Sequence, residues 1–275
     1  MDGTVTRRSR PSPWDTVPAT VESVEPLGPH LIRLVVCGPH LRDLRDDGPD
    51  QRLKIVLPDS GEMRALTISE LDTEAGRLTM VIVRHEPAGA LGQWLAGARP
   101  GDDVVLSAAT TRSSEVPVGV DWRPPPNLEN LLVVADATAL PAVARILAGL
   151  GAHVTGTVLV SVRSAEESIA LPRPRGMRLE WVLDGDDDWV SRTVVARLGE
   201  LPLRGIRRTR ADVVEPESDS LLWEIAAPAT GSFYAWVACE SGLVRAVRRH
   251  LLVDRGVPRD CVSFMGYWRR DPTAA

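Results

Sequence analysis

The sequence predicts two domains, an N-terminal antiparallel β-barrel followed by an α/β domain with a parallel sheet. Three observations support this prediction. The chain has 275 residues, which exceeds the usual size of one domain. Its first third contains short runs rich in Val, Ile, Leu and Thr that turn sequences separate, as in barrels and sandwiches. Beyond a run of three prolines, strand-like and helix-like segments alternate, which is typical of a parallel sheet with crossover helices.

The barrel is assigned to residues 1–120. Turn sequences such as DDGP, PDSGE and TEAG bound its apolar segments. The predicted strands are residues 19–26, 30–37, 52–57, 63–69 and 77–84. A short helix is predicted over residues 90–98, and the sequence ARPGDDVVLS that follows it predicts a turn and a last barrel strand.

Residues 121–130 are predicted to form a linker. Three consecutive prolines, at positions 124–126, remove amide donors and hold the chain extended, so no regular element is expected there.

The α/β domain is assigned to residues 131–275. The apolar run LLVVA at 131–135 is typical of a strand that is buried on both faces. A helix is predicted over residues 139–150, with Thr138 as its N-cap. The further predicted elements are strands at 154–162, 178–183, 233–238 and 261–265 and helices at 189–198 and 241–255. Residues 204–220 are polar without periodicity and are predicted to form a loop.

Composition excludes several classes of function. The net charge is −5 with no basic stripe, so no nucleic-acid partner is expected. Cys37, Cys239 and Cys261 lack the spacing of metal ligands, which favours free thiols in a reducing compartment and no metal site. No signal peptide or membrane-spanning apolar run is recognisable. We therefore expect a soluble, cytoplasmic protein that acts on a small molecule.

Three local motifs are candidates for ligand binding. In RALT, at 64–67, an arginine and a hydroxyl lie three residues apart on a predicted strand and project to opposite faces. In HEPAGALGQW, at 85–94, a glycine-containing turn precedes a helix whose first N–H groups could bind phosphate. The strand, turn and helix of residues 131–150 would place a nucleotide beyond the carboxyl end of the strand.

Taken together and in this order, the motifs resemble the siderophore-interacting protein family, which comprises flavin reductases related to the ferredoxin-reductase fold. The resemblance includes DQRLKIVLP at 50–58, RALT, the 85–94 segment and PGDDV at 100–104. It continues with ADATALPAVARIL at 135–147, AWVACE at 235–240, VRAVRRHL at 244–251 and GYWRR at 266–270. The ALPA helix and the GYWR ending are the most specific of these motifs.

The resemblance implies reduction of ferric siderophores by an FAD-binding-type barrel and an NAD(P)H-binding-type α/β domain. Electrons would come from NAD(P)H bound by the second domain or from a ferredoxin. Arg64 matches an arginine expected near the FAD pyrophosphate, and Thr67 matches a residue expected near the flavin ring. The residues implied at the FAD are Arg64, Ala65, Leu66, Thr67, His85, Gly89, Ala90, Leu91 and Gly92. Those implied on the nucleotide side are Asp136, Ala137, Thr138 and Glu240.

Several of these positions depart from the family pattern. Leu66 replaces a tyrosine that stacks on the isoalloxazine, and Ser69 replaces a second arginine. The family's Gly-Pro-Ala-Ser is Gly-Ala-Leu-Gly at 89–92, and alanine or cysteine stands at 135, 137 and 239 in place of glycine, glutamate and glycine. A charge-assisted phosphate contact contributes roughly 1.5–3 kcal/mol. Loss of two or three contacts could weaken FAD binding by about two to four orders of magnitude.

A second hypothesis therefore stays open, in which the chain is a flavin-free homologue. It would act as a non-redox enzyme, such as a cyclase, or as a small-molecule binder in specialised-metabolite biosynthesis. Lys54, the only lysine of the chain, and His85 are its catalytic candidates, although His85 could equally be a structural histidine. Arg64 and Arg112 are further polar candidates. Trp94 and Trp268 are candidates for the pocket, or else a helix anchor and a C-terminal clasp. The substrate, the electron donor and the oligomeric state stay open.

Overall fold

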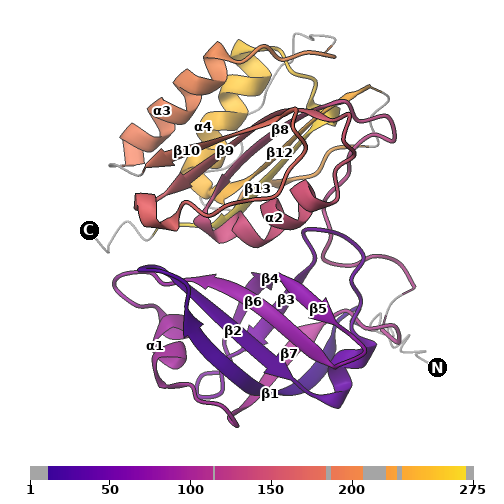
Figure 1. The fold of residues 1–275 in the computed structure, drawn as a ribbon, viewed down its shortest axis with the longest axis vertical. Helices are drawn as coiled ribbons and strands as arrows, with labels where there is room; N and C mark the ends of the chain where they lie inside the picture. The colour runs from indigo at the N-terminus through magenta and orange to yellow at the C-terminus, as the bar shows by residue number, and fades with distance from the viewer. Residues whose placement is uncertain (1–11, 114, 184–186, 207–220, 228–230, 271–275) are drawn as a thin grey trace, which may run out of the picture.

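The computed structural model describes residues 12–113, 115–183, 187–206, 221–227 and 231–270. It contains two sheets that lie in separate halves of the molecule, one formed by the first third of the chain and one by the rest (Figure 1). This arrangement confirms the predicted β-barrel followed by an α/β domain.

The N-terminal sheet has seven strands in the order β4-β3-β7-β1-β2-β6-β5, and every pair in it is antiparallel. The strands are β1 (Asp15–Pro26), β2 (Leu31–Cys37), β3 (Arg52–Val56), β4 (Met63–Thr67), β5 (Glu70–Asp72), β6 (Arg77–Val83) and β7 (Asp103–Ala108). Side chains of alternate positions fill its interior, and Leu34, Ile55 and Met80 are fully buried there.

One bent segment joins the two edges of this sheet. β4 pairs with β3 and β5 pairs with β6, yet only Ile68 and Ser69 separate β4 from β5 in the chain. The Ser69 amide donates to the Thr79 carbonyl at 2.9 Å, and the Ser69 hydroxyl accepts from the Val81 amide at 3.1 Å. Residues 63–72 therefore close the barrel, where the sequence predicted a single strand over residues 63–69.

The predicted linker of residues 121–130 overlaps the second sheet by one residue, because Asn130 is the first residue of β8. Residues 120–129 form neither helix nor strand between β7 and β8. Before them, α1 (Ala90–Gly97) lies against the barrel, and its Trp94 packs on the barrel core as a helix anchor. A short 3-10 helix, η1 (Pro39–Asp43), follows β2.

The second sheet has six strands in the order β10-β9-β8-β12-β13-β11. The strands are β8 (Asn130–Asp136), β9 (Thr155–Val162), β10 (Met177–Leu183), β11 (Trp223–Glu224), β12 (Phe233–Glu240) and β13 (Val262–Trp268). Five of them are parallel, and the two-residue β11 is antiparallel to β13. From β8 the chain proceeds to one side and from β12 to the other, so the β8–β12 junction is the topological switch point.

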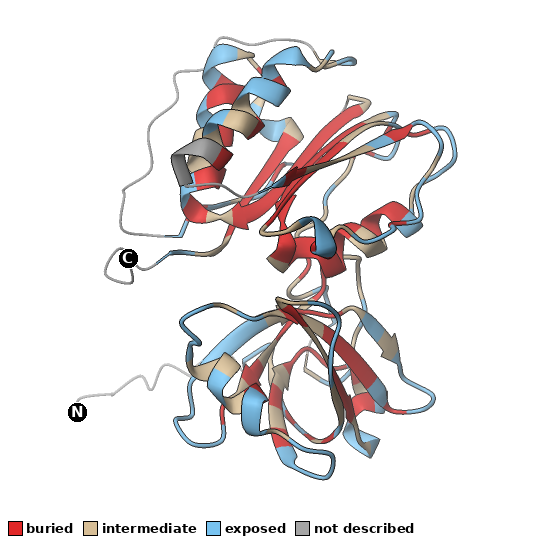
Figure 2. Ribbon diagram, turned by 60° about the vertical axis from the view of Figure 1, so that its left-hand side comes forward, coloured by how far each residue is buried: buried red, intermediate tan, exposed pale blue. Residues whose placement is uncertain are grey.

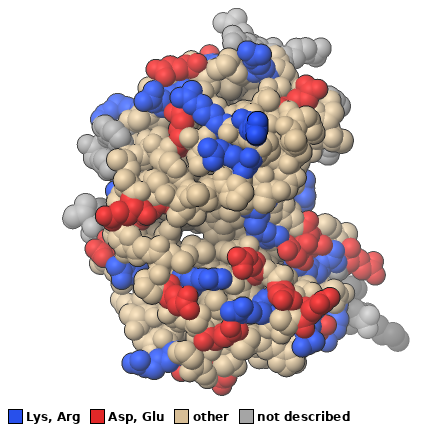
Figure 3. All heavy atoms as spheres, viewed as in Figure 1, with Lys and Arg blue, Asp and Glu red and all other residues tan. Residues whose placement is uncertain are grey.

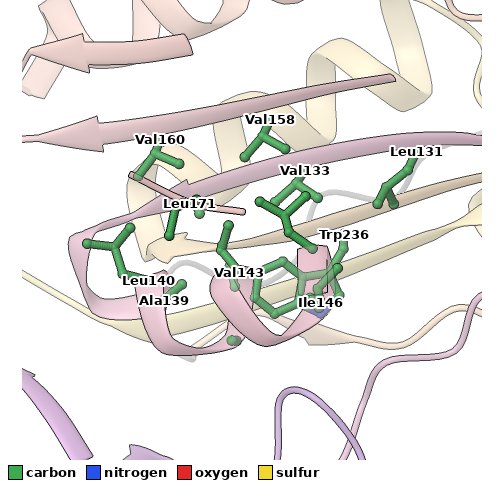
Figure 4. Close-up of a cluster of buried hydrophobic side chains, with 14 of the residues drawn as sticks. Leu131, Val133, Ala139, Leu140, Val143, Ile146, Val158, Val160, Leu171 and Trp236 are labelled. Carbon is green, nitrogen blue, oxygen red and sulfur yellow. The ribbon is translucent and has the colours of Figure 1, made fainter. Parts of the chain in front are cut away.

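Helices cover both faces of this sheet. α2 (Leu140–Ala148) packs on the face nearer the barrel, and α3 (Asp187–Glu200) and α4 (Ser241–Arg249) pack on the other (Figure 1). Figure 4 shows Val143 and Ile146 of α2 directed at Val133 of β8 and Trp236 of β12. The central strands are consequently buried between two layers, as Figure 2 shows.

The helix boundaries differ from the prediction at two places. Thr138 is not the N-cap of a helix: the Asp136 carboxylate accepts from the Thr138 amide and caps a 3-10 turn, η2 (Ala137–Ala139), before α2 begins. The helix predicted over residues 241–255 is α-helical only to Arg249 and then becomes a π-helical turn, η4 (His250–Asp254). Most of the loop predicted at 204–220 lies outside the described residues.

The two halves are in contact. Leu31, Val81 and Val83 of the barrel pack against the apolar cluster beneath α2. Arg145 of α2 donates to the Ile68 carbonyl at 3.2 Å and forms an ion pair with Asp46. Across the residues that the structure describes, no helix is long and apolar enough to span a bilayer. Within the same residues, no group of three His, Cys, Asp or Glu side chains could hold a metal ion.

Candidate functional site

A cavity of about 1220 Å³ lies between the two halves, and the space-filling view shows the surface indented where they meet (Figure 3). Its volume exceeds the roughly 300–1,000 Å³ of ordinary small-molecule sites. The barrel side contributes the ends of β4 and β6 and the start of α1, and the α/β side contributes the ends of β9 and β13. The lining includes Arg52, Arg64, Ala65, Leu66, Thr67, His85, Gly89, Ala90, Leu91, Gly92, Thr138, Arg163, Trp223, Tyr267, Trp268, Arg269 and Arg270.

The lining is cationic. It includes five arginines, at positions 52, 64, 163, 269 and 270, and one carboxylate, that of Glu86. Arg64 forms an exposed ion pair with Glu62 at 2.7 Å, on the same strand edge. A concave surface with this balance of charge attracts anionic ligands.

The start of α1 offers backbone donors to the cavity. Gly89 is the N-cap of this helix, and no side chain accepts a hydrogen bond at the cap. Ala90, Leu91 and Gly92, which follow it, line the cavity. A Cβ placed on Gly89 would meet no atom within 4 Å, so a ligand can approach the backbone closely here. With Arg64 in the same lining, this end of the cavity suits a phosphate or diphosphate group.

β4 supplies a hydroxyl and an aliphatic side chain. Thr67 is 6% exposed and lines the cavity together with Tyr267. Leu66 also lines the cavity and rests on the barrel core. The wall at Leu66 is therefore apolar but not aromatic, as the sequence implied. Ser69 lies two residues after Thr67, and its hydroxyl accepts a hydrogen bond from the Val81 amide of β6.

An aromatic column faces β4. The Trp223 ring stacks on the Tyr267 ring with 5.9 Å between centroids and 6° between planes. The Arg52 guanidinium lies 4.5 Å from the centroid of Trp223. Asp121 fixes the column, because it pairs with Arg52 and accepts from the Trp223 indole at 3.1 Å. Burial raises the pKa of Tyr267 far above its usual value, so the hydroxyl stays neutral.

The sequence reasoning missed this column. Trp223 lies on β11, which is too short to leave a periodic pattern, and Asp121 lies in the segment predicted only as a linker. The apolar residues at 221–223 and 225 do not alternate with polar ones, so the sequence offers no strand period here.

His85 lines the cavity between the two halves. Its Nδ1 lies 3.2 Å from Nη2 of Arg163, and its ring packs on Trp268 with centroids 4.9 Å apart. A guanidinium can only donate, so Nδ1 accepts and the ring proton is on Nε2. Burial lowers the pKa of His85, and the positive charges of Arg163 and Arg270 lower it further. His85 is therefore a neutral side chain with one N–H donor to offer.

Asp136 lies at the switch point with both carboxylate oxygens engaged. Its Oδ1 accepts from the amide and hydroxyl of Thr138, at 2.9 and 2.5 Å. Its Oδ2 accepts from the Glu240 amide at 2.7 Å and from the Trp268 indole at 2.8 Å. Burial raises the pKa of this carboxyl, and the four hydrogen bonds oppose that shift. The side chain ties together the ends of β8, β12 and β13.

Glu240 closes the neighbouring helix start. It is the N-cap of α4, where its Oε2 accepts from the Gly242 amide at 2.5 Å and the Leu243 amide at 3.1 Å. Its Oε1 accepts from the Arg270 amide at 3.3 Å. Cys239 beside it is fully buried, and burial raises the pKa of its thiol.

The cavity thus brings together most of the residues that the sequence singled out. Every residue implied at the FAD lines it, as do Thr138 and Trp268. Lys54 and Arg112 lie elsewhere: the Lys54 ammonium is 5.9 Å from the centroid of the Trp14 ring, and Arg112 pairs with Asp43 at 2.9 Å. Asp136, Ala137 and Glu240 lie behind the lining, at the strand ends.

Two family models match the chain. The model described as the siderophore-interacting FAD-binding domain matches residues 20–63 and 59–112. The model described as siderophore-interacting protein matches residues 128–271, which contain the whole second sheet.

Known proteins are similar over almost the whole chain. The chain is 27% identical over 258 residues to the mycobactin import ATP-binding/permease protein IrtA of Mycolicibacterium smegmatis. That alignment covers 91% of this chain but 25% of IrtA, so the chain spans about a quarter of the length of this relative.

Solved structures share the fold. The siderophore-interacting protein SipS of Aeromonas hydrophila aligns with a TM-score of 0.72 and 23% identity over 96% of each chain. A siderophore utilization protein from T. fusca aligns with a TM-score of 0.70 and 23% identity over 97% of each chain. A ferredoxin reductase in carbazole 1,9a-dioxygenase aligns with a TM-score of 0.64 and 16% identity, over 93% of this chain and 70% of that one. The architecture is therefore of the ferredoxin-reductase type.

Proposed function

The chain belongs to the siderophore-interacting protein family, and from this premise we propose that it is an FAD-dependent reductase of ferric siderophores. The observation that carries the proposal is the meeting of Arg64, the uncapped start of α1 and the buried hydroxyl of Thr67 in one cationic cavity. These groups provide what a flavin dinucleotide requires, namely donors for a diphosphate and a polar contact beside an apolar wall.

The residues present fit FAD. Arg64 and the N–H groups at the start of α1 would hold its diphosphate, and the open approach to Gly89 leaves room for that group. Leu66 would cover the isoalloxazine with an apolar surface, and Thr67 would bond to its polar edge. When bound, FAD would supply the electron transfer to chelated Fe(III), with two Fe(III) reduced for each two-electron equivalent received.

The remaining work of the chain is binding and orientation. The arginine-rich lining would draw an anionic ferric chelate toward the cavity and hold it there. His85, kept neutral with its proton on Nε2, would donate a hydrogen bond without adding another positive charge. The aromatic column of Arg52, Trp223 and Tyr267 would form a rigid wall, because Asp121 fixes it from behind. No side chain is required as a general acid or base.

A second candidate function rests on Leu66. Its aliphatic side chain stands where the family places a stacking tyrosine, so the flavin loses an aromatic partner. A homologue that no longer binds flavin would use the same cavity for a non-redox reaction or for simple binding of an anionic small molecule. Lys54 lies outside the cavity lining, which leaves His85 as the better placed of the two catalytic candidates.

Absorption spectroscopy separates the two functions. The purified chain is titrated with FAD, reduced with dithionite without oxygen, and then mixed with a ferric siderophore. The name of IrtA makes ferric mycobactin a reasonable first substrate. Saturable binding, bleaching by dithionite and reoxidation by the ferric chelate support the reductase. Absence of FAD binding at tens of micromolar, roughly the range of a weak cofactor site, would eliminate it and favour the flavin-free hypothesis.

The family resemblance leaves two sources for the electrons, NAD(P)H or a ferredoxin. The NAD(P)H hypothesis requires a dinucleotide site in the α/β domain. In this fold such a site lies at the switch point, where Asp136 and Glu240 accept hydrogen bonds from backbone amides.

A further inference from the structure

The switch point of the α/β sheet is closed by the chain's own carboxylates and by its C-terminal segment. We infer that this domain does not hold a nicotinamide dinucleotide at the switch point. If the proposed reductase function is correct, the electrons then come from a donor that does not use this site. The first statement stands without the proposed function, and only the second rests on it.

A dinucleotide bound in this fold needs free backbone donors. In doubly wound sheets the pyrophosphate lies beyond the carboxyl ends of the strands at the switch point, against N–H groups at a helix start, and small residues let the backbone approach it. Here the equivalent groups are the turn after β8, which leads to α2, and the turn after β12, which leads to α4.

Asp136 engages the Thr138 amide of the first turn and the amide at the end of β12. Its two oxygens accept four hydrogen bonds, including those of the Thr138 amide and the Glu240 amide. Asp136 is 8% exposed, so its side chain lies within the turn rather than beside it. A pyrophosphate would have to take these same N–H groups from a buried carboxylate, which would keep only the Thr138 hydroxyl and the Trp268 indole as donors.

Glu240 consumes the donors of the second turn. Its carboxylate already accepts from the Gly242 and Leu243 amides at the start of α4. The 3-10 turn η2 and the helix α4 therefore each begin at a carboxylate of the protein, in the position of an anionic ligand. Two carboxylates would repel a pyrophosphate placed between them.

The segment that ends β13 covers what remains. The Trp268 indole donates to Asp136, and the Arg270 amide donates to Glu240 at 3.3 Å, so residues 268–270 lie across the strand ends. Trp268 then packs on His85 of the barrel. Ala135 and Ala137, at the two positions beside Asp136, are themselves buried and present Cβ atoms where close approach needs glycine.

The start of α1 provides the contrast within the same molecule. Its N-cap, Gly89, has no side-chain acceptor, and its first residues line the cavity. At the switch point, by contrast, side-chain carboxylates cap the 3-10 turn η2, which leads into α2, and the helix α4.

The test measures binding of the diphosphate part alone. The 275-residue chain is titrated by calorimetry with ADP-ribose and with 2′-phospho-ADP-ribose, which are NAD and NADP without the nicotinamide. FAD-saturated protein is used first, so that the α1 end of the cavity is occupied. We expect no saturable heat for either compound at concentrations up to about 1 mM. A dissociation constant of about 1 mM would already mean very weak binding. Saturable binding below about 100 µM would overturn the inference.

The Arg64→Ala variant keeps the test decisive if the chain binds no FAD. In that case the titration uses apo-protein, and a compound bound at the start of α1 loses affinity in Arg64→Ala, which supports the inference. A compound bound at the switch point keeps its affinity in that variant, because Arg64 lies on the barrel side. That result would contradict the inference. The FAD titration therefore tests the proposed function, and the ADP-ribose titrations test the inference about the switch point.

Rapid mixing provides a second readout for the FAD-bound protein. NADH or NADPH should bleach the bound flavin no faster than either bleaches free FAD, while dithionite bleaches it fully. A bleaching rate that saturates with either nucleotide would refute the inference.

Discussion

Nη2 of Arg163 lies 3.2 Å from Nδ1 of His85, and this contact joins the end of β9 to the loop that follows β6. The two side chains come from different halves of the molecule, and both line the cavity. Because the guanidinium only donates, the contact requires a neutral imidazole with its proton on Nε2.

The first prediction concerns pH. The pKa of His85 lies below its ordinary value of 6.5 in the folded chain, first because of burial and then because of Arg163 and Arg270. As pH falls below 6.5, the unfolded state binds a proton that the folded state refuses, so folding loses stability. Urea denaturation at several pH values measures this loss. As pH falls below about 6.5, the free energy of unfolding should fall more for the native chain than for His85→Gln. Parallel pH profiles of the two proteins would contradict the assignment.

The second prediction concerns Arg64. Arg64→Ala should weaken FAD binding by about tenfold or more, since a charge-assisted hydrogen bond contributes roughly 1.5–3 kcal/mol. The measurement is a fluorescence titration with FAD. Arg112→Ala is the matched control, because Arg112 is an exposed arginine of the same half that pairs with Asp43 away from the cavity. Equal affinities for the two variants would remove Arg64 from the diphosphate site.

The third prediction concerns Leu66. Leu66→Tyr restores an aromatic face to the cavity wall and should tighten FAD binding by about three- to tenfold, because aromatic pairs contribute roughly 0.5–1.5 kcal/mol. Leu66→Phe tests whether the ring alone suffices. If neither variant binds FAD more tightly than the native chain, the flavin ring does not lie on β4.

The fourth prediction concerns the indole of Trp268. Trp268→Phe keeps a ring against His85 but removes the donor to Asp136, which leaves a buried acceptor one hydrogen bond short. The free energy of unfolding should fall by about 1–3 kcal/mol. Trp223→Phe is the comparison, since it also loses an indole hydrogen bond to an aspartate but at a site that is 39% exposed. A larger loss in Trp223→Phe would argue against the closed switch point.

The fifth prediction concerns Lys54. Lys54→Met should leave FAD affinity and any reductase activity unchanged, because the ammonium lies over Trp14 rather than in the cavity lining. Loss of activity with normal folding, measured by circular dichroism and turnover together, would instead return Lys54 to the list of catalytic candidates.

Much of the fold could be predicted from the sequence, because its long elements have a clear period. The strand at 131–135 and the helix after it are found within one or two residues of β8 and α2. The short elements could not be predicted. β5 and β11 have three and two residues and exist through pairing with β6 and β13, which a local pattern does not record.

The candidate site divides in the same way. The α1 turn and β4 could be placed, because their residues are adjacent in the chain and resemble a family motif. The arrangement at the switch point could not, since Asp136, Glu240 and Trp268 are far apart in sequence and meet only when β8, β12 and β13 are in register. The choice of Thr138 as N-cap failed for a local reason. Asp136, two residues earlier, is an equally good cap and claims the Thr138 amide itself.

Leu31, Val81 and Val83 belong to the barrel strands, yet they complete the apolar cluster that α2 covers in the other half. Arg145 adds its bond to the Ile68 carbonyl at the same junction. If either half were produced alone, it would expose apolar side chains that the other half covers. A protease cut within residues 120–129 would therefore leave two fragments that remain associated as a noncovalent complex. Heating the intact chain would melt both halves in a single calorimetric transition.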